Sequence, residues 1–134
     1  MPLQRISISS GKDFAYRQAV ADGVHRALVE TCGVPEDDRF QIVTEHAPGS
    51  LVCSPKYLGI AHGRAPVLIQ ITLNRGRTVA QKKALYARIA DLLFESAHVP
   101  RADVIVSLVQ VEKEDWSFGD GLAQYAPDEP KPAG

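Results

Sequence analysis

Two arginines, Arg75 and Arg77, follow directly on an apolar stretch over residues 67–73. Residues i and i+2 of an extended or turning backbone project to the same side, so the two side chains can converge on one anion. A guanidinium group presents a planar fork of donors that matches a carboxylate. The spacing indicates a site for a small acid, with two solvated loop arginines as the alternative. On this stretch alone, the solvated arginines are favoured.

Pro2 is a second candidate for chemistry, because it follows Met1 at the start of the sequence. A small second residue allows removal of the initiator methionine, and we expect the mature chain to begin with the secondary amine of Pro2. Such an amine is a nucleophile or an acid–base group that needs no side chain. Proline is also a common and harmless second residue, so Pro2 by itself decides nothing.

The apolar stretch before the arginines occurs twice in the chain. A shift of 65 residues lays LQRISISSGK (residues 3–12) on LIQITLNRGR (residues 68–77) without a gap. The match continues through a helical segment and places Asp38 on Asp103. Alternating apolar residues predict strands, and helical periodicity follows each strand. We therefore predict a duplicated β-α-β unit, with copies at about residues 2–46 and 67–111.

The repeat predicts an α/β (α+β) fold with a four-stranded mixed sheet and two helices on one face. Each unit should have a right-handed crossover. If the first strands of the two units pair antiparallel, Pro2 lies near Arg75 and Arg77. Asp38, at the entrance to the second strand, could complete the site. The other sheet face is apolar in the strands at 67–73 and 104–111 and needs a cover, which oligomerisation would provide.

Local signals place the remaining elements. Thr78 and Gln81 form a T-x-x-Q capping box, which predicts a helix start directly after the arginines. The bridge between the repeats is irregular, with a possible short strand at 51–53. Glycines near the end predict a tight hairpin over residues 115–121, whose rings, Trp116 and Phe118, would share one face. Those rings would pack the core, seal a subunit contact or wall a pocket, and core or contact is the default.

Composition limits the class of protein. The chain has 134 residues and a formal net charge of -1, which gives no electrostatic case for nucleic acid or an acidic membrane. One domain is expected over residues 1–126, followed by a disordered Pro-rich tail at 127–134. No apolar run is long enough for a membrane span, and no signal peptide is visible. Cys32 and Cys53 are expected to be free thiols without metal-ligand spacing, which favours a reducing, cytoplasmic location.

Taken together, these residues resemble the tautomerase superfamily, and most closely its malonate semialdehyde decarboxylase branch. The matching segments are GVPEDDRFQIV, ITLNRGRT, DVIVSLV and DWSFGDG. The resemblance implies a homotrimer with active sites near subunit boundaries and neither a metal nor an organic cofactor. One position departs from the pattern, because Gly76 stands between the arginines where a proline is familiar.

The resemblance also assigns roles to residues of this chain. It implies that Pro2 is the catalytic amine and that Asp38 activates water or polarises the site. It implies that Arg75 and Arg77 bind the substrate carboxylate. An aromatic wall is implied at Trp116, Phe118 and Tyr125.

The function expected from these roles is a cofactor-independent lyase that decarboxylates a short 3-oxo acid such as malonate semialdehyde, with hydration as a further activity. One alternative is keto–enol tautomerisation of a 2-oxo acid such as phenylpyruvate, with neutral Pro2 as the base. Another is a non-catalytic trimer that binds a small acid. The first two differ in the protonation state of Pro2.

Overall fold

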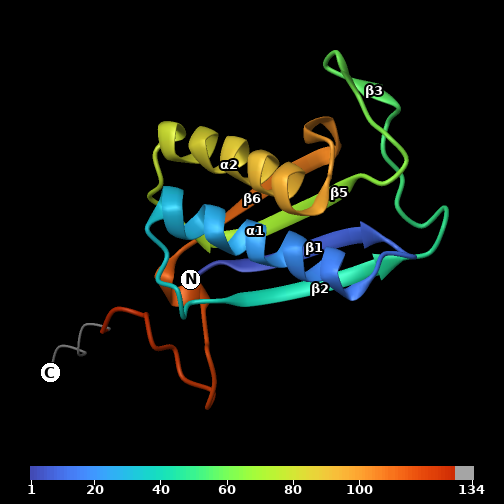
Figure 1. Cartoon of the computed structure of the whole chain (residues 1–134). Coiled ribbons are helices and arrows are strands. Elements are labelled where there is room, and N and C mark those ends of the chain that lie inside the picture. Colours follow the sequence, from blue (N-terminus) through green and yellow to red (C-terminus); the bar gives the residue numbers. More distant parts are fainter. Residues whose placement is uncertain (129–134) are drawn as a thin grey trace, which may run out of the picture.

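The fold is a four-stranded mixed sheet with two helices on one face, as predicted (Figure 1). A computed structural model describes residues 1–128 of the chain. The strand order across the sheet is β2 (Phe40–His46), β1 (Leu3–Ser9), β5 (Val67–Asn74) and β6 (Val104–Val111). Within each repeat the strands are parallel, and the two repeats meet where β1 and β5 pair antiparallel.

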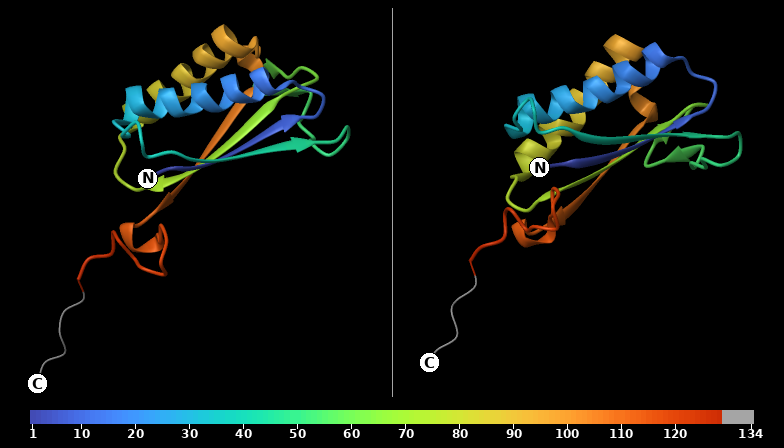
Figure 2. Two further views of the ribbon diagram at one scale, coloured as in Figure 1. Left: turned by 60° about the horizontal axis from the view of Figure 1, so that its bottom comes forward. Right: turned by 90° about the horizontal axis from the view of Figure 1, so that it is seen from below.

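Two helices cover the same face of the sheet, α1 (Phe14–Cys32) and α2 (Val79–Ala97) (Figure 2). The capping box predicted at Thr78 and Gln81 starts α2, with both of its hydrogen bonds present. Each helix ends at a residue in the left-handed region, Gly33 after α1 and His98 after α2, as helix ends often do. None of the helices in the described part of the chain is long and apolar enough to cross a membrane.

The hydrophobic core lies between the sheet and the helices. Alternate residues of β1 and β5 point into it, and a stripe from each helix meets them. At Gly23 of α1 the two helices approach so closely that a Cβ there would lie 2.8 Å from Leu93 Cδ1. Burial of apolar surface at about 25 cal/mol per Å² drives this packing. The core therefore fixes the register of the strands, on which the site described below depends.

The face of the sheet opposite the helices is mixed in character. Strand alternation places exposed apolar side chains there, among them Phe40, Ile42 and Val109. The same face carries exposed polar residues such as Arg5 and Gln70. The predicted apolar face is thus interrupted by polar side chains along its centre.

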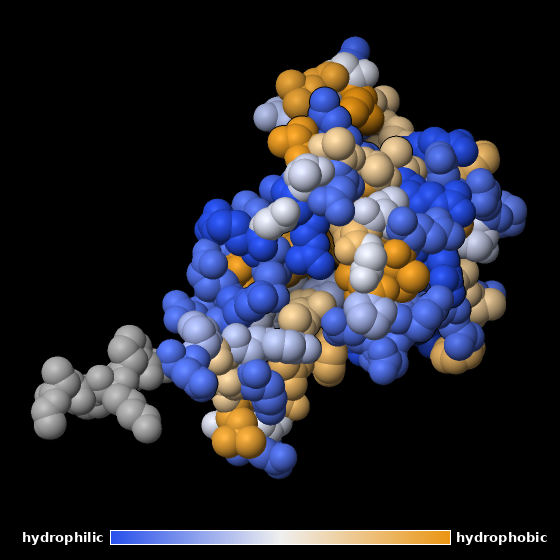
Figure 3. Space-filling view, turned by 90° about the vertical axis from the view of Figure 1, so that its left-hand side faces the viewer, coloured by the Kyte–Doolittle hydropathy of each residue, from blue (hydrophilic) through white to orange (hydrophobic). Residues whose placement is uncertain are grey.

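The bridge between the repeats contains a small hairpin, β3 (Lys56–Tyr57) and β4 (Ile60–Ala61), which stands away from the helices and the sheet (Figure 1). The strand predicted at 51–53 is wrong, because the pairing lies later in the bridge. Leu58, with φ 50°, precedes Gly59 at the tip and is 83% exposed. Figure 3 shows hydrophobic residues grouped at the top of the molecule, where this hairpin stands.

The segment after β6 lies at the end of the sheet close to the N-terminus, on the side away from the helices (Figure 2). It begins with a short 3-10 helix, η2 (Lys113–Asp115). The hairpin predicted over residues 115–121 is wrong, because no strand forms in this segment. The side chain of Gln124 closes it as a loop instead, accepting from the Phe118 N–H at 3.0 Å and donating to the Gly119 carbonyl at 3.1 Å. Of the tail predicted at 127–134, residues 129–134 lie outside the described residues.

Candidate functional site

Four residues form a row across the sheet at the end where β1 begins. The register of β1 with both of its neighbours, continued outward by two residues, places Met1 between Asp38 and Asn74. Asn74 pairs in turn with Val111 of β6. Strand alternation places Asn74 and Val111 on the face away from the helices, and Met1 and Asp38 line a cavity together with Phe118 of the segment after β6. The row brings together residues that are up to 110 positions apart in the sequence. It exists because the first strands of the two repeats pair with each other.

The N-terminal nitrogen and Asp38 form an ion pair. The amino group of Met1 lies 2.5 Å from Asp38 Oδ2, and both side chains are less than a fifth exposed. Pro2 itself is buried. Removal of Met1 would uncover the secondary amine of Pro2 within this row. The structure thus brings Asp38 to the start of the chain, as the repeat geometry predicted.

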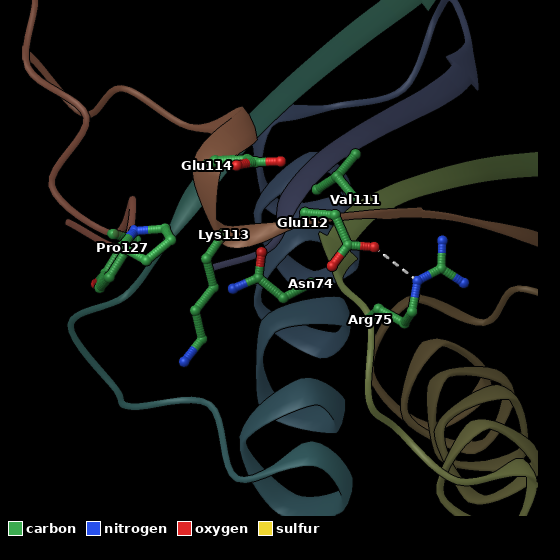
Figure 4. A pocket seen from close by; sticks show the side chains of 8 residues that line it. Asn74, Arg75, Val111, Glu112, Lys113, Glu114 and Pro127 are labelled. Carbon is green, nitrogen blue, oxygen red and sulfur yellow. Dashed lines mark hydrogen bonds and ion pairs between the residues drawn. The ribbon is translucent and has the colours of Figure 1, made fainter. Parts of the chain in front are cut away.

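Arg75 and Arg77 stand at the end of β5, but each has a different partner. Arg75 Nε lies 2.8 Å from Glu112 Oε1, and its side chain is 62% exposed (Figure 4). Arg77 is half-buried and donates to the backbone carbonyl of Asn74 at 3.2 Å. Their convergence on one anion stays a prediction. The terminal nitrogens of Arg75 are not used by the pair with Glu112, so they are available to a ligand.

The predicted aromatic residues form one cluster with a further ring. The rings of Trp116 and Phe118 stack, with centroids 5.3 Å apart and planes at 13°. Phe118 also meets Tyr125 edge-on at 5.5 Å and Phe40 at 5.3 Å. We call these four rings the aromatic cluster. Phe40 begins β2 on the open face, and it was not among the predicted site residues.

Two cavities border rings of this cluster. The N-terminal cavity, of about 360 Å³, is lined by Met1, Asp38, Phe118 and Tyr125, among others. The arginine cavity, of about 520 Å³, is lined by Arg75 and Asn74, and again by Tyr125 (Figure 4). Tyr125 is therefore a shared wall. Within residues 1–128, no three or more His, Cys, Asp or Glu side chains are grouped as metal ligands would be.

The glycine between the arginines changes the shape of their loop. Gly76 has φ 129°, a conformation that side chains rarely adopt. A proline, whose ring holds φ near −65°, cannot take it. The sequence departure at this position is therefore also a departure in backbone conformation.

Asp103, the equivalent of Asp38 in the second repeat, does not lie in a comparable site. Asp103 is only 4% exposed and accepts a hydrogen bond from the Gly63 N–H at 2.6 Å. Val67 stands where the first repeat has Pro2, and Lys12 stands where the second has Arg77. Burial, and secondarily the charge of Asp103, raises the pKa of the neighbouring Tyr16. Asp103 thus serves to hold the bridge against the sheet.

Three residues of the site were missed from the sequence: Phe40, Asn74 and Glu112. Asn74 could have been found, because counting outward from the antiparallel pairing already places it beside the N-terminus. Phe40 lies on the open face of β2, and no sequence motif around it marks it as a site residue. Glu112 is visible only once the turn after β6 is known, since its partner is 37 residues away.

Comparisons with known proteins agree with this geometry. Two family models, both described as tautomerase enzyme, match residues 38–119 and residues 2–61. The probable tautomerase YusQ of Bacillus subtilis is 36% identical over 92% of this chain and 98% of its own length. A crystal structure of malonate semialdehyde decarboxylase inhibited by 3-bromopropiolate is 37% identical, covers 92% of this chain and 93% of its own, and has a TM-score of 0.86. A fused 4-OT protein, described as a symmetric trimer, is 27% identical over 92% of this chain and 97% of its own, with a TM-score of 0.75. The chain belongs to the tautomerase enzyme family.

Proposed function

We propose that this protein is a lyase that uses the N-terminal amine of Pro2 to decarboxylate a short 3-oxo acid such as malonate semialdehyde. The observation that carries the proposal is the position of Asp38, whose Oδ2 lies 2.5 Å from the Met1 nitrogen, next in the chain to the Pro2 amine, in a cavity lined by Phe40, Phe118 and Tyr125. The similarity to a malonate semialdehyde decarboxylase over nearly the whole chain supports the choice of reaction.

Binding begins at the arginines. The substrate carboxylate would take the free guanidinium nitrogens of Arg75 and Arg77. The exposed pair of Arg75 with Glu112 contributes only about 0–1 kcal/mol. A charge-assisted hydrogen bond to a bound carboxylate is worth about 1.5–3 kcal/mol, so the substrate can share or displace Glu112.

The chemical step breaks the bond between the carboxylate carbon and C2. Protonated Pro2 polarises the C3 carbonyl, and the carbonyl oxygen takes up the electron pair as carbon dioxide leaves and a C2–C3 double bond forms. Alternatively, neutral Pro2 adds to C3 and expels water to give an iminium, whose nitrogen takes up the same electron pair. The resulting enol or enamine takes a proton at C2, and the iminium route also restores water, so malonate semialdehyde yields acetaldehyde and carbon dioxide. Asp38 holds the amine in place or orients a water, which also allows hydration. The aromatic cluster excludes solvent and strengthens these charges.

A homotrimer without a metal or organic cofactor is part of the same proposal. Tautomerase-fold neighbours include trimers. The exposed apolar residues of the open face and of the β3–β4 hairpin give this chain surfaces that a partner copy would bury. The cytoplasmic location stays a prediction from the sequence.

The second candidate function is keto–enol tautomerisation of a 2-oxo acid such as phenylpyruvate. The name of the YusQ relative favours it. In this reaction neutral Pro2 would act as the base, whereas decarboxylation uses the protonated amine. A third possibility, a trimer that binds a small acid without turnover, uses the same arginines.

One experiment separates the three. The protein with a free Pro2 is assayed for kcat/KM on malonate semialdehyde, by acetaldehyde formation, and on phenylenolpyruvate, by ketonisation. The proposal expects a kcat/KM at least a hundredfold higher for the first substrate. A preference for phenylenolpyruvate would make the protein a tautomerase, and binding of both acids without turnover would make it a binding protein.

A further inference from the structure

Asn74 is a buried polar residue that the proposed mechanism does not use. It is the last residue of β5 and is 8% exposed. In the row across the sheet it flanks the N-terminus on the side opposite Asp38. It also directly precedes Arg75 and lines the arginine cavity (Figure 4). Asn74 therefore sits between the position of the amine and the position of the carboxylate-binding group.

Trp116 determines which way the side-chain amide of Asn74 faces. The indole N–H of Trp116 lies 2.7 Å from Asn74 Oδ1. An indole nitrogen can only donate, so the atom that it meets must be the amide oxygen. The amide nitrogen then faces away from Trp116, and no residue in 1–128 accepts a hydrogen bond from it. The structure thus holds two N–H donors of Asn74 ready for an acceptor.

We infer that Asn74 donates a hydrogen bond from Nδ2 to the carbonyl oxygen of the bound 3-oxo acid. Trp116 acts through it as a positioning residue that fixes the amide orientation. This inference rests on the proposed function, because it places the carboxylate on Arg75 and the carbonyl carbon at Pro2. Negative charge develops on that oxygen as the carbon–carbon bond breaks. A fixed donor aimed at developing charge stabilises the transition state more than the ground state.

The direct test reads the side-chain amide of Asn74 by NMR and needs no turnover. Its ¹H–¹⁵N pair is assigned by its loss in Asn74→Asp. Two stable probes are compared: malonamate, which has a carboxylate and an amide carbonyl, and propanoate, which has the carboxylate alone. We expect both acids to shift the arginine side-chain signals, and only malonamate to shift the Asn74 pair. Equal shifts from both acids, or no shift of the Asn74 pair with malonamate, would overturn the inference.

The kinetic test uses the link between Asn74 and Trp116. Loss of one such donor commonly lowers kcat by about 10²–10³-fold, so Asn74→Ala should do so with a smaller change in KM. Trp116→Phe keeps a ring against Phe118 but frees the amide to flip, and should lower kcat by about tenfold. Because Trp116 acts through Asn74, the double variant should be no slower than Asn74→Ala. A double variant whose loss of kcat equals the product of the two single losses would refute this coupling.

A matched control removes a side-chain amide that lies outside the site. Gln18 is exposed on α1, on the far side of the core from the site, and Gln18→Ala should leave both the kinetics and the malonamate shift unchanged. Failure of the proposed function is seen separately, as a wild-type protein that does not turn over malonate semialdehyde. In that case the malonamate comparison still decides the role of Asn74.

Discussion

Replacing Asp38 with asparagine removes the carboxylate partner of the N-terminal amine while keeping the size of the side chain. Asp38 Oδ2 pairs with the Met1 nitrogen at 2.5 Å, and both groups are less than a fifth exposed, so solvent would screen Asp38 from a Pro2 amine uncovered at this place only in part. A charge-assisted hydrogen bond of this kind is worth about 1.5–3 kcal/mol. Each 1.36 kcal/mol of lost transition-state stabilisation is tenfold in rate. Asp38→Asn should therefore lower kcat/KM for decarboxylation by about 10- to 150-fold.

The duplication supplies the control for this variant. Asp103 is the repeat equivalent of Asp38, but it accepts from the Gly63 N–H and is remote from any proline amine. The space is tight, since a Cβ at Gly63 would lie 2.7 Å from Asp103 Oδ2. Asp103→Asn should therefore cost about 1–3 kcal/mol of unfolding free energy and leave the kinetics of the folded fraction near wild type.

The assay measures kcat/KM on malonate semialdehyde and denaturant unfolding for both variants in parallel. The reasoning expects opposite profiles, with activity lost in Asp38→Asn and stability lost in Asp103→Asn. Equal losses of activity in the two variants would show that both carboxylates have the same structural role, such as holding a turn. The assignment of Asp38 to the chemistry would then be wrong.

Three further results are expected. Arg75→Ala and Arg77→Ala should each lower turnover by about ten- to a hundredfold through loss of a contact worth about 1.5–3 kcal/mol; thermal unfolding should change little, because the Arg75 pair with Glu112 is exposed. Wild-type kinetics in both would place the carboxylate elsewhere. A preparation that keeps Met1 or an N-terminal tag should be folded but inactive until Pro2 is exposed, and full activity with Met1 confirmed by mass spectrometry would exclude amine chemistry. Sedimentation at micromolar concentration should give a trimer, and a stable monomer would contradict the assembly.

The sheet and its two helices were predictable because their signals are local and repeated. Alternation in residues 67–73 marks a strand, Thr78 and Gln81 mark a helix start, and the 65-residue shift marks the second copy. Antiparallel pairing of the two copies then predicted that Pro2 lies near Arg75 and Arg77, with Asp38 at the entrance to the second strand to complete the site. These inferences needed only periodicity and the geometry of paired strands.

The predictions that failed concern contacts that no pattern in the neighbouring sequence reveals. Gly119 and Gly121 indicate a turn, but no alternating strands flank them, and Gln124 closes a loop there instead. Trp116 was expected as a wall, and its indole N–H also fixes Asn74, 42 residues earlier. Such a partner is chosen by the folded geometry and leaves no pattern in the nearby sequence.

The most direct test of amine chemistry follows the nitrogen of Pro2 itself. A protein with ¹⁵N-labelled Pro2 at its N-terminus is titrated by NMR, and kcat/KM for malonate semialdehyde is measured over the same pH range. Polarisation by the protonated amine predicts that the rate falls as Pro2 loses its proton, with the protonated amine present at neutral pH. A rate that stays flat across the titration of Pro2 would contradict amine chemistry, and a rate that rises as the amine becomes neutral would contradict polarisation by the protonated amine.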